Sequence, residues 1–205
     1  MSGDMAAARP SGRVKGAPLR ALVELLAMER SRAELDAIVA QLSDEDRAAL
    51  AIDAERPGLG ILAGSWYSAA ACGALMDAVW GSLDPRERES FDERVADHVM
   101  KTTLTGVHRA VFRLVGSPSL MRDRGQMFWD RQFDCGRVKI SDLGPGRQRH
   151  EYHAWAAHHP LLCRITFKCV APMFRAMGLR EPRVELEQCI ERGAPHCAAI
   201  VRWSE

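Results

Sequence analysis

The sequence predicts an α+β fold in which N-terminal helices pack on a four-stranded antiparallel sheet that one helix crosses. Two observations predict it. Apolar residues recur with the helical period of 3.6 through the first two thirds of the chain, and after residue 136 the period changes to two in four short runs. A chain of 205 residues that is 47% apolar can bury one core. We therefore expect one domain over residues 14–205 behind a flexible N-terminus of residues 1–13.

Helices dominate the first part of the chain, and residues 14–57 are interpreted as a helical cap on the rest. The segments predicted to be helical are 18–32, 33–52, 68–80, 85–115 and 120–133. Segment 68–80 is apolar on almost every side, which is typical of a central helix. Gly106 is expected to loosen the long helix, and Ser117-Pro118 supplies an N-cap and a first-turn proline for the last one.

The second part of the chain is predicted to form two hairpins separated by a helix. The predicted strands are 137–143, 148–155, 183–189 and 196–203. Gly144-Pro145-Gly146 joins the first two strands, and a turn with Gly193 joins the last two. Between the hairpins, segment 161–179 is predicted to be a helix that is kinked near Pro172.

Composition argues against several partners. The net charge is +1 and arginines are scattered, so neither nucleic acid nor an anionic membrane surface is expected as a partner. The sequence shows no run of 18 apolar residues and no signal peptide. We therefore expect a cytoplasmic protein without a membrane span, in which the six cysteines stay reduced.

Enzyme signatures are missing from the sequence. The glycines at 58, 60 and 64 lack both the lysine and the preceding strand of a phosphate loop, and no Gly-x-Ser-x-Gly motif occurs. Most carboxylates lie on charged helix faces, where solvation explains them. We predict that the protein is not an enzyme.

The last hairpin is the most informative segment, because Cys189 and Cys197 fall on opposite strands near its turn. Such a hairpin brings the two thiols side by side. Cys72 and Cys169 lie in apolar helices, where a buried thiol is the ordinary expectation, and Cys135 adjoins a turn. Three cysteines are left that could share a site: Cys163, Cys189 and Cys197.

Several motifs together resemble those of a paralogous family of myxobacterial proteins, over about residues 14–203. They are the Trp66-Tyr67 helix start, Ser117-Pro118, Phe133-Asp-Cys-Gly136 and the Cys189–Cys197 hairpin that ends in Trp203. More remotely, the C-terminal half is similar to the vinyl-4-reductase-type small-molecule-binding domain of aromatic-sensing activators. That domain is related in fold to haem nitric-oxide-binding domains and to vesicle-tethering subunits, and the resemblance implies a homodimer.

The resemblance also implies a structural zinc. In phenol-sensing members of that group three cysteines and a glutamate hold the ion, and Cys163, Cys189 and Cys197 fall at the matching spacings. Leu186 stands where the glutamate is expected. Zinc needs a fourth ligand, and we assign it to Glu187 on the face of Cys189. Glu185, His159 and His196 are the alternatives, and simple packing of the thiols between helix and sheet is another.

Four histidines lie close together in sequence: His150, His153, His158 and His159. Such a group could bind haem or a transition metal. On a strand, however, His150 and His153 point to opposite faces, and His158-His159-Pro160 is typical of a loop that leads into a helix. We therefore expect no haem, and zinc as the only cofactor.

The function hypothesis is a sensory domain for a small apolar molecule. Aromatic and methionine side chains of three helices would enclose a cavity above the sheet, or else would fill the core completely. The residues assigned to the ligand are Trp80, Phe128, Trp129, Phe167 and Met173. The alternative is a dimeric protein-interaction module without a small ligand, which the related tethering subunits suggest.

Overall fold

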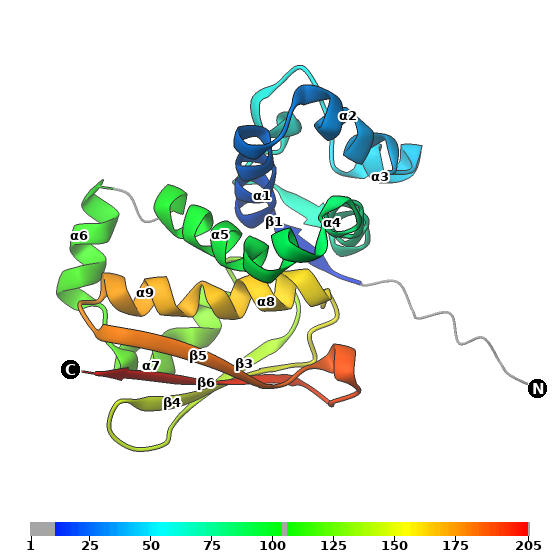
Figure 1. The fold of residues 1–205 in the computed structure, drawn as a ribbon. Coiled ribbons are helices and arrows are strands. Elements are labelled where there is room, and N and C mark those ends of the chain that lie inside the picture. Colours follow the sequence, from blue (N-terminus) through cyan, green and yellow to red (C-terminus); the bar gives the residue numbers. More distant parts are fainter. Residues whose placement is uncertain (1–10, 104–105, 205) are drawn as a thin grey trace, which may run out of the picture.

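The computed structural model describes residues 11–103 and 106–204, and its α+β architecture confirms the predicted fold class (Figure 1). In chain order the elements are β1 (Arg13–Lys15), α1 (Gly16–Glu29), α2 (Arg32–Ala40), α3 (Asp44–Ala49), η1 (Pro57–Gly60), β2 (Trp66–Ser68), α4 (Ala69–Ser82), α5 (Pro85–Thr103), α6 (Gly106–Val115), α7 (Pro118–Trp129), β3 (Arg137–Asp142), β4 (Arg147–His153), α8 (Pro160–Lys168), α9 (Val170–Ala176), β5 (Arg180–Gln188), η2 (Ile190–Arg192) and β6 (Cys197–Ser204).

The four predicted strands form one antiparallel sheet in the order β3-β4-β6-β5. Gly146 ends the β3–β4 turn in the left-handed region, at φ 63°, where a side chain would strike the carbonyl of Trp203. Along β4, His150 and Tyr152 face the helices, since their rings contact Phe174 of α9 and Phe167 of α8. Their sequence neighbours on β4 therefore face the opposite side of the sheet.

Helices α7, α8 and α9 cover one face of the sheet (Figure 1). Within the described residues no helix covers the other face, which we call the open face. The residues of β4 alternate accordingly, because those that face the helices are buried and the others are arginine, glutamate and histidine. The open face and the helix-covered face each carry one of the side-chain clusters discussed below.

The N-terminal helices belong to the same core as the sheet. Helix α1 packs along α5, and its leucines Leu19, Leu22 and Leu26 are buried. Ser31 caps α2 through a capping box in which the Glu34 carboxylate accepts a hydrogen bond from the backbone N–H of Ser31. The helix predicted over 33–52 is therefore two helices, α2 and α3, and Ser43 caps the second.

Two short strands were missed by the sequence analysis. Trp66 to Ser68 forms β2 and not the start of a helix, and it pairs with β1 in an antiparallel ribbon. A three-residue strand has no room for a periodic pattern, so only the pairing itself reveals it. Of the residues expected to be flexible, 1–10 lie outside the described residues. Ser11 donates a backbone hydrogen bond to Ala156, and Arg13 opens β1.

The two longest predicted helices are each divided. The segment 85–115 consists of α5 and α6, which begins at Gly106. The segment 161–179 divides at Cys169 and not at Pro172. Pro172 lies in the first turn of α9, where a residue without an N–H is tolerated. Among the helices described, none combines the length and apolar character that crossing a membrane requires.

Candidate functional site

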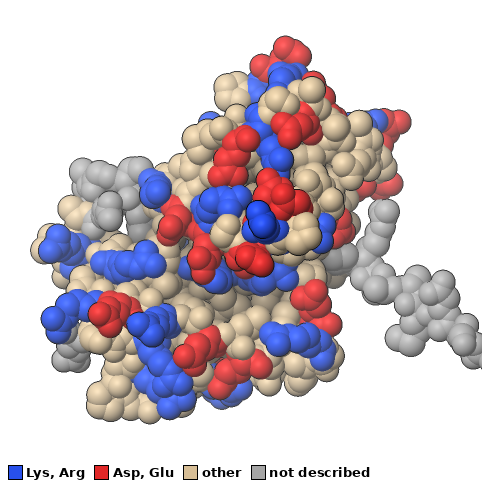
Figure 2. Space-filling model, viewed as in Figure 1, with Lys and Arg blue, Asp and Glu red and all other residues tan. Residues whose placement is uncertain are grey.

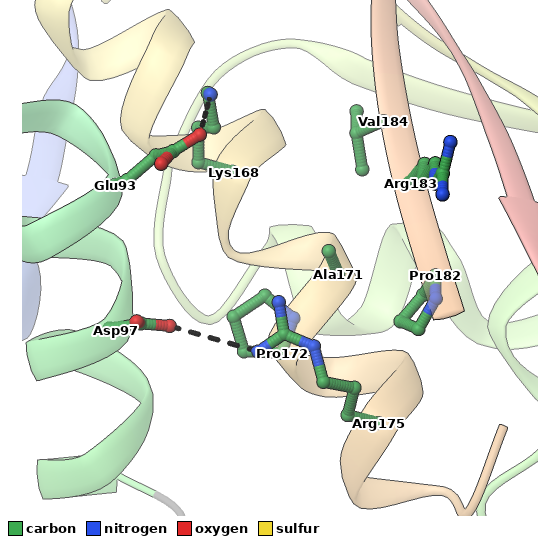
Figure 3. A pocket seen from close by; sticks show the side chains of 9 residues that line it. All are labelled: Glu93, Asp97, Lys168, Ala171, Pro172, Arg175, Pro182, Arg183 and Val184. Atoms are coloured by element: carbon green, nitrogen blue, oxygen red, sulfur yellow. Dashed lines mark hydrogen bonds and ion pairs between the residues drawn. The ribbon is translucent and has the colours of Figure 1, made fainter. Parts of the chain in front are cut away.

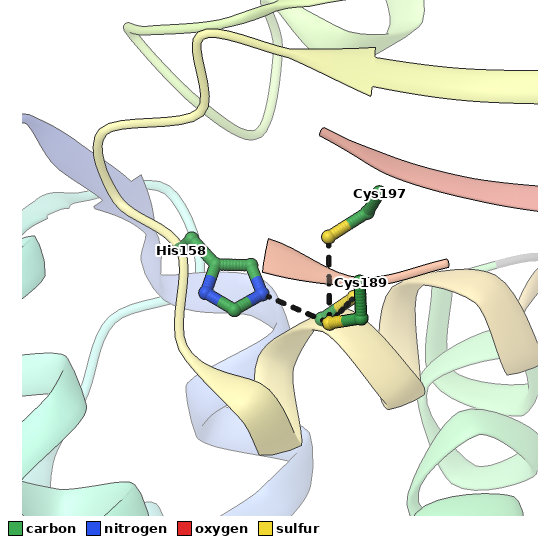
Figure 4. Close-up of side chains that lie close together, drawn as sticks. His158, Cys189 and Cys197 are labelled. Carbon is green, nitrogen blue, oxygen red and sulfur yellow. Dashed lines mark hydrogen bonds between the residues drawn. The ribbon is translucent and has the colours of Figure 1, made fainter. Parts of the chain in front are cut away.

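Four side chains from three separate segments meet at one end of the sheet. They are His158, Cys163, Cys189 and Cys197, and we call them the thiol cluster; their ligand atoms all lie within 4.8 Å of one another. The Sγ atom of Cys189 lies 3.7 Å from that of Cys163, 3.5 Å from that of Cys197 and 3.5 Å from Nε2 of His158. Figure 4 shows His158 and the two hairpin thiols pointing toward one another. All three cysteines are buried.

The local structure of α8 and of the β5–β6 hairpin positions each residue of the thiol cluster. His159 caps α8, since its Nδ1 accepts a hydrogen bond from the N–H of Leu161, so His158 stands just before the helix and Cys163 stands in its first turns. Cys189 and Cys197 flank the turn η2, at the end of β5 and the start of β6. The backbone N–H of Ile190 donates to Sγ of Cys197, which holds the turn against the cluster.

The spacing of the cluster fits tetrahedral metal coordination. Metal–sulfur bonds of about 2.3 Å at tetrahedral angles separate two sulfur atoms by about 3.8 Å, and a nitrogen ligand lies about 3.6 Å from each sulfur. The measured distances around Cys189 are 3.7, 3.5 and 3.5 Å. The three distances from Cys189 therefore match those around a tetrahedral ion, and the other three pairs of ligand atoms lie within 4.8 Å.

Hydrogen bonding makes the three thiols unequal. The hydrogen bond from Cys163, together with those from His158 and from the N–H of Ile190, lowers the pKa of Cys197 to about 4 despite its burial. The same bond with Cys197 raises the pKa of Cys163, and burial raises the pKa of Cys189. Cys197 is thus the thiol of the cluster that ionises most readily, and a thiolate is the form that binds metal.

Glu187, assigned above as the fourth ligand, does not belong to this cluster. Its carboxylate accepts a hydrogen bond at 2.8 Å from Nε of Arg149, on the open face. A β-bulge between Leu186 and Gln188 breaks the strict alternation on which that assignment depended. Glu187 and Cys189 consequently point to opposite faces, and His158 takes the fourth position.

A second feature is a mostly apolar hollow of about 160 Å³ between α7, the helix-covered face of the sheet, and helices α8 and α9, which we call the α7 hollow. Residues that line it include Phe128, Trp129, Val138, His150, Cys169 and Met173. Helix α7 approaches β3 closely at Gly125, where a Cβ atom would lie 2.9 Å from Cδ1 of Ile140. The N–H of Val138 donates to Oε1 of Gln126, which ties the helix to the strand.

Of the residues assigned to a ligand, the structure brings Phe128, Trp129 and Met173 together around the α7 hollow. Phe167 instead stacks on Tyr152 within the core, with ring centroids 4.6 Å apart. Trp80 lies away from the hollow, where the guanidinium of Arg164 stands 4.4 Å from its ring. The sequence analysis did not assign His150 to the hollow, although its alternation with Arg149 placed it on the inner face.

His150 is the main titratable group of the hollow, and burial lowers its pKa to about 4. The imidazole is therefore neutral in the folded protein at physiological pH. In the unfolded chain it protonates near pH 6.5. Between those two values the unfolded state binds a proton that the folded state does not, so His150 makes stability fall as the pH falls from 6.5 to 4.

We expect the free energy of unfolding to lose about 3 kcal/mol through His150 across this window. Urea unfolding of the wild type and of His150→Leu at pH 7 and pH 4.5 measures it. The variant should lose less stability between the two pH values than the wild type, by about that amount. Equal losses in the two proteins would contradict the expectation, because all other titrating groups are shared.

A polar groove of about 290 Å³ lies between α5, α9 and β5 (Figure 3). Lys168 forms an ion pair with Glu93 across it, and Arg175 pairs with Asp97. Basic and acidic side chains are also interspersed on the face of the molecule seen in Figure 2. Because the charges of the groove largely neutralise one another, we assign it no ligand.

Comparison with known proteins gives structural neighbours alone. No family model matches the chain, and no curated protein does. An H-NOX protein from S. oneidensis in its Fe(II)NO state has a TM-score of 0.62 at 12% identity, over 93% of this chain and 99% of that one. An Fe(II) unliganded H-NOX protein from K. algicida gives 0.62 at 12% identity, over 93% and 97%. A T. tengcongensis H-NOX variant gives 0.58 at 11% identity, over 93% and 98%.

These neighbours overturn the cofactor prediction made from the sequence, which was zinc without haem. The matched structures are described by their Fe(II) and Fe(II)NO states, and one of them was solved to study haem distortion in the H-NOX family. The opposite faces of His150 and His153 were therefore no ground for excluding haem, since a single axial histidine is enough. At 11–12% identity the likeness establishes architecture: the chain has the fold of the H-NOX proteins.

Proposed function

We propose that this chain is a non-catalytic sensory domain that binds a small ligand in the α7 hollow. The observation that carries the proposal is a mostly apolar hollow with a buried, neutral histidine in its wall. The H-NOX fold supports a sensory role, and so does the resemblance of the C-terminal half to vinyl-4-reductase-type domains. The proposal includes a cytoplasmic homodimer.

The size of the hollow favours an apolar ligand of about one aromatic ring. A cavity of about 150 Å³ lined by apolar side chains binds benzene in another protein. The α7 hollow has a similar volume of about 160 Å³, and its wall is formed mainly by aromatic, aliphatic and methionine side chains. A ligand there would touch α7, the sheet and α9 together, so its binding would stabilise their mutual packing.

Haem is the other ligand to be tested, because the structural neighbours point to it. Its donor chemistry fits, since His150, Cys169 and Met173 are residue types that bind haem iron, and His150 is neutral. The volume is small, because pockets for larger ligands measure about 300–1,000 Å³. Haem would therefore require α7 to move away from the sheet, and when bound it would supply an iron that binds a diatomic gas.

We further propose that the thiol cluster holds a thiophilic divalent metal ion through His158, Cys163, Cys189 and Cys197. The tetrahedral spacing and the lowered pKa of Cys197 support it. Cys197 is paired across the sheet with Tyr152, which lines the α7 hollow. An ion in the cluster would thus hold the β5–β6 hairpin to α8 and fix the floor of the ligand site.

Two probes test the ligand site on the full chain. Benzene at ten times its Kd should stabilise the protein by about 1.4 kcal/mol, which raises Tm by about 3–6 °C. Hemin should give a Soret band if the site takes haem, and His150→Ala should shift that band. Val138→Phe, which adds bulk inside the hollow, should abolish either response, and Trp80→Phe, outside it, should preserve them. If neither benzene nor hemin binds, the proposal is overturned.

A further inference from the structure

A second group of metal-ligating side chains lies on the open face of the sheet, away from both features described above. It consists of Glu151, His153 and His196, which we call the open-face triad. Oε1 of Glu151 lies 3.2 Å from Nε2 of His196 and 3.7 Å from Nε2 of His153. The two imidazole rings stack, with centroids 4.1 Å apart. Both rings thus direct Nε2 to one carboxylate oxygen.

The surroundings of the triad combine a buried carboxylate with an accessible histidine. The side chain of Glu151 is 6% exposed, whereas that of His153 is 38% exposed. Nε2 of His153 is buried and has no hydrogen-bond partner among the described residues. One imidazole nitrogen of the triad is therefore aimed at the carboxylate without any hydrogen bond of its own, on a ring that is partly exposed.

The basic residues that contact Glu151 have another partner or are exposed to water, so the carboxylate of Glu151 can bind a cation instead. Arg149 donates from Nη1 to Glu151 at 3.1 Å, and from Nε to Glu187 at 2.8 Å. If Glu151 turns to a metal ion, Arg149 keeps its partner Glu187. Lys139, at 3.5 Å from Oε2 of Glu151, is 67% exposed, so it moves into water at little cost. Nε2 of His196 also contacts Nε2 of the Gln188 amide at 2.7 Å, so an ion bound to this nitrogen would take the place of that contact.

We propose that the open-face triad binds a borderline divalent transition-metal ion such as Ni²⁺ or Cu²⁺. Two imidazoles and one carboxylate are the ligands that such ions favour, and they leave further positions to water. Ligand atoms bonded to one such ion lie about 3.0–3.4 Å apart, so the contact with His196 already fits. His153 completes the set when its ring turns out of the stack.

The open-face triad and the thiol cluster lie on opposite faces of the β5–β6 hairpin. Gln188 and His196 lie on the open face, whereas the next residues, Cys189 and Cys197, point to the helix-covered face. The β5–β6 hairpin therefore offers imidazole and carboxylate ligands on one side and thiols on the other. The ring of His153 is 38% exposed, so an ion in the open-face triad would be reached from the medium through this side chain, in contrast to an ion held among buried thiols.

Calorimetric titration of the full chain with Ni²⁺ tests this site. The wild type should bind Ni²⁺, and both His153→Ala and Glu151→Gln should weaken the affinity by more than about tenfold. His98→Ala, a matched control on α5 whose imidazole pairs with Glu24, should leave it unchanged. Circular dichroism of each variant confirms folding, and His153→Ala should fold because that side chain is partly exposed.

Absorption spectra distinguish this site from the thiol cluster. Ni²⁺ held by imidazole and carboxylate gives weak visible bands, whereas Ni²⁺ held by thiolates adds intense near-ultraviolet charge-transfer bands. The proposal expects the first spectrum for the ion that His153→Ala removes. It is overturned by equal Ni²⁺ affinity in the wild type and His153→Ala, or by a thiolate spectrum for that ion. Neither outcome depends on ligand binding in the α7 hollow.

Discussion

With an ion in the thiol cluster, as proposed above, replacing Cys197 with alanine is expected to lower the free energy of unfolding by more than about 4 kcal/mol. The thiol is buried, accepts the N–H of Ile190 and contacts Cys189, so its loss removes one ligand and two interactions. Three remaining ligands hold an ion far less tightly than four. Urea unfolding gives the energy, and elemental analysis of the purified protein gives the metal content, which should fall from about one ion per chain to none.

Cys72→Ala is the matched control, because Cys72 is equally buried but lies on α4 away from the cluster. Burial raises the pKa of Cys72 to about 12, so this thiol stays protonated and does not bind metal. We expect a loss of about 1 kcal/mol with unchanged metal content. If Cys197→Ala and Cys72→Ala destabilise the protein equally and neither binds metal, the thiols of the cluster are packing residues.

The fold class was predictable from the sequence because the period of the apolar residues changes where the architecture changes. Burial on one face imposes period two on β4, and the helices keep period 3.6. Helix boundaries were less predictable. The break expected between residues 32 and 33 lies at Ser31, and the break at Ser43 was missed because it does not interrupt the apolar pattern. The β1–β2 ribbon was missed because three residues carry no period.

The candidate site was predictable only in part. Cysteine spacing brought Cys189 and Cys197 together, because a hairpin places its flanking residues side by side whatever the details of the turn, and the resemblance to phenol-sensing domains added Cys163. The fourth member depends on the path of the loop before α8 and on a bulge in β5, and neither follows from a periodic pattern. The prediction of a loop at His158 was confirmed, but its place in the cluster was missed, and Glu187 was assigned as a ligand instead.

The residues assigned to the ligand site were also predictable only in part. Aromatic side chains on apolar helices were grouped because each could face a cavity, but rotation about a helix axis decides which of them does. Phe128 and Trp129 of α7 face the hollow, whereas Trp80 contacts Arg88 and Arg164. A cation can cover an aromatic face at the surface, so an aromatic residue in an apolar helix does not have to be buried.

Trp129→Ala is expected to lower the free energy of unfolding by about 4 kcal/mol. The indole lies in an aromatic cluster, with centroids 4.3 Å from Phe133, 4.6 Å from Tyr152 and 4.9 Å from Trp155. Its Nε1 donates to the carbonyl of Cys135 at 2.7 Å. Truncation therefore removes the contacts that join α7 to β4 and leaves the partly buried carbonyl of Cys135 without its donor. Chemical denaturation followed by far-ultraviolet circular dichroism measures the loss.

Two further variants separate the origins of that loss. Trp129→Phe keeps a ring in the cluster but removes the donor, so it should cost about 1–2 kcal/mol. Trp66→Ala removes an indole of the same size whose ring contacts Nζ of Lys15 at 4.5 Å, and an exposed cation–π contact contributes only about 0.5–1 kcal/mol. If Trp66→Ala destabilises the protein as much as Trp129→Ala, the aromatic cluster is not the main link between α7 and the sheet. The order Trp129→Ala, Trp129→Phe, Trp66→Ala, from largest loss to smallest, would instead place that link in ring packing beside the α7 hollow, where a bound ligand would add to it.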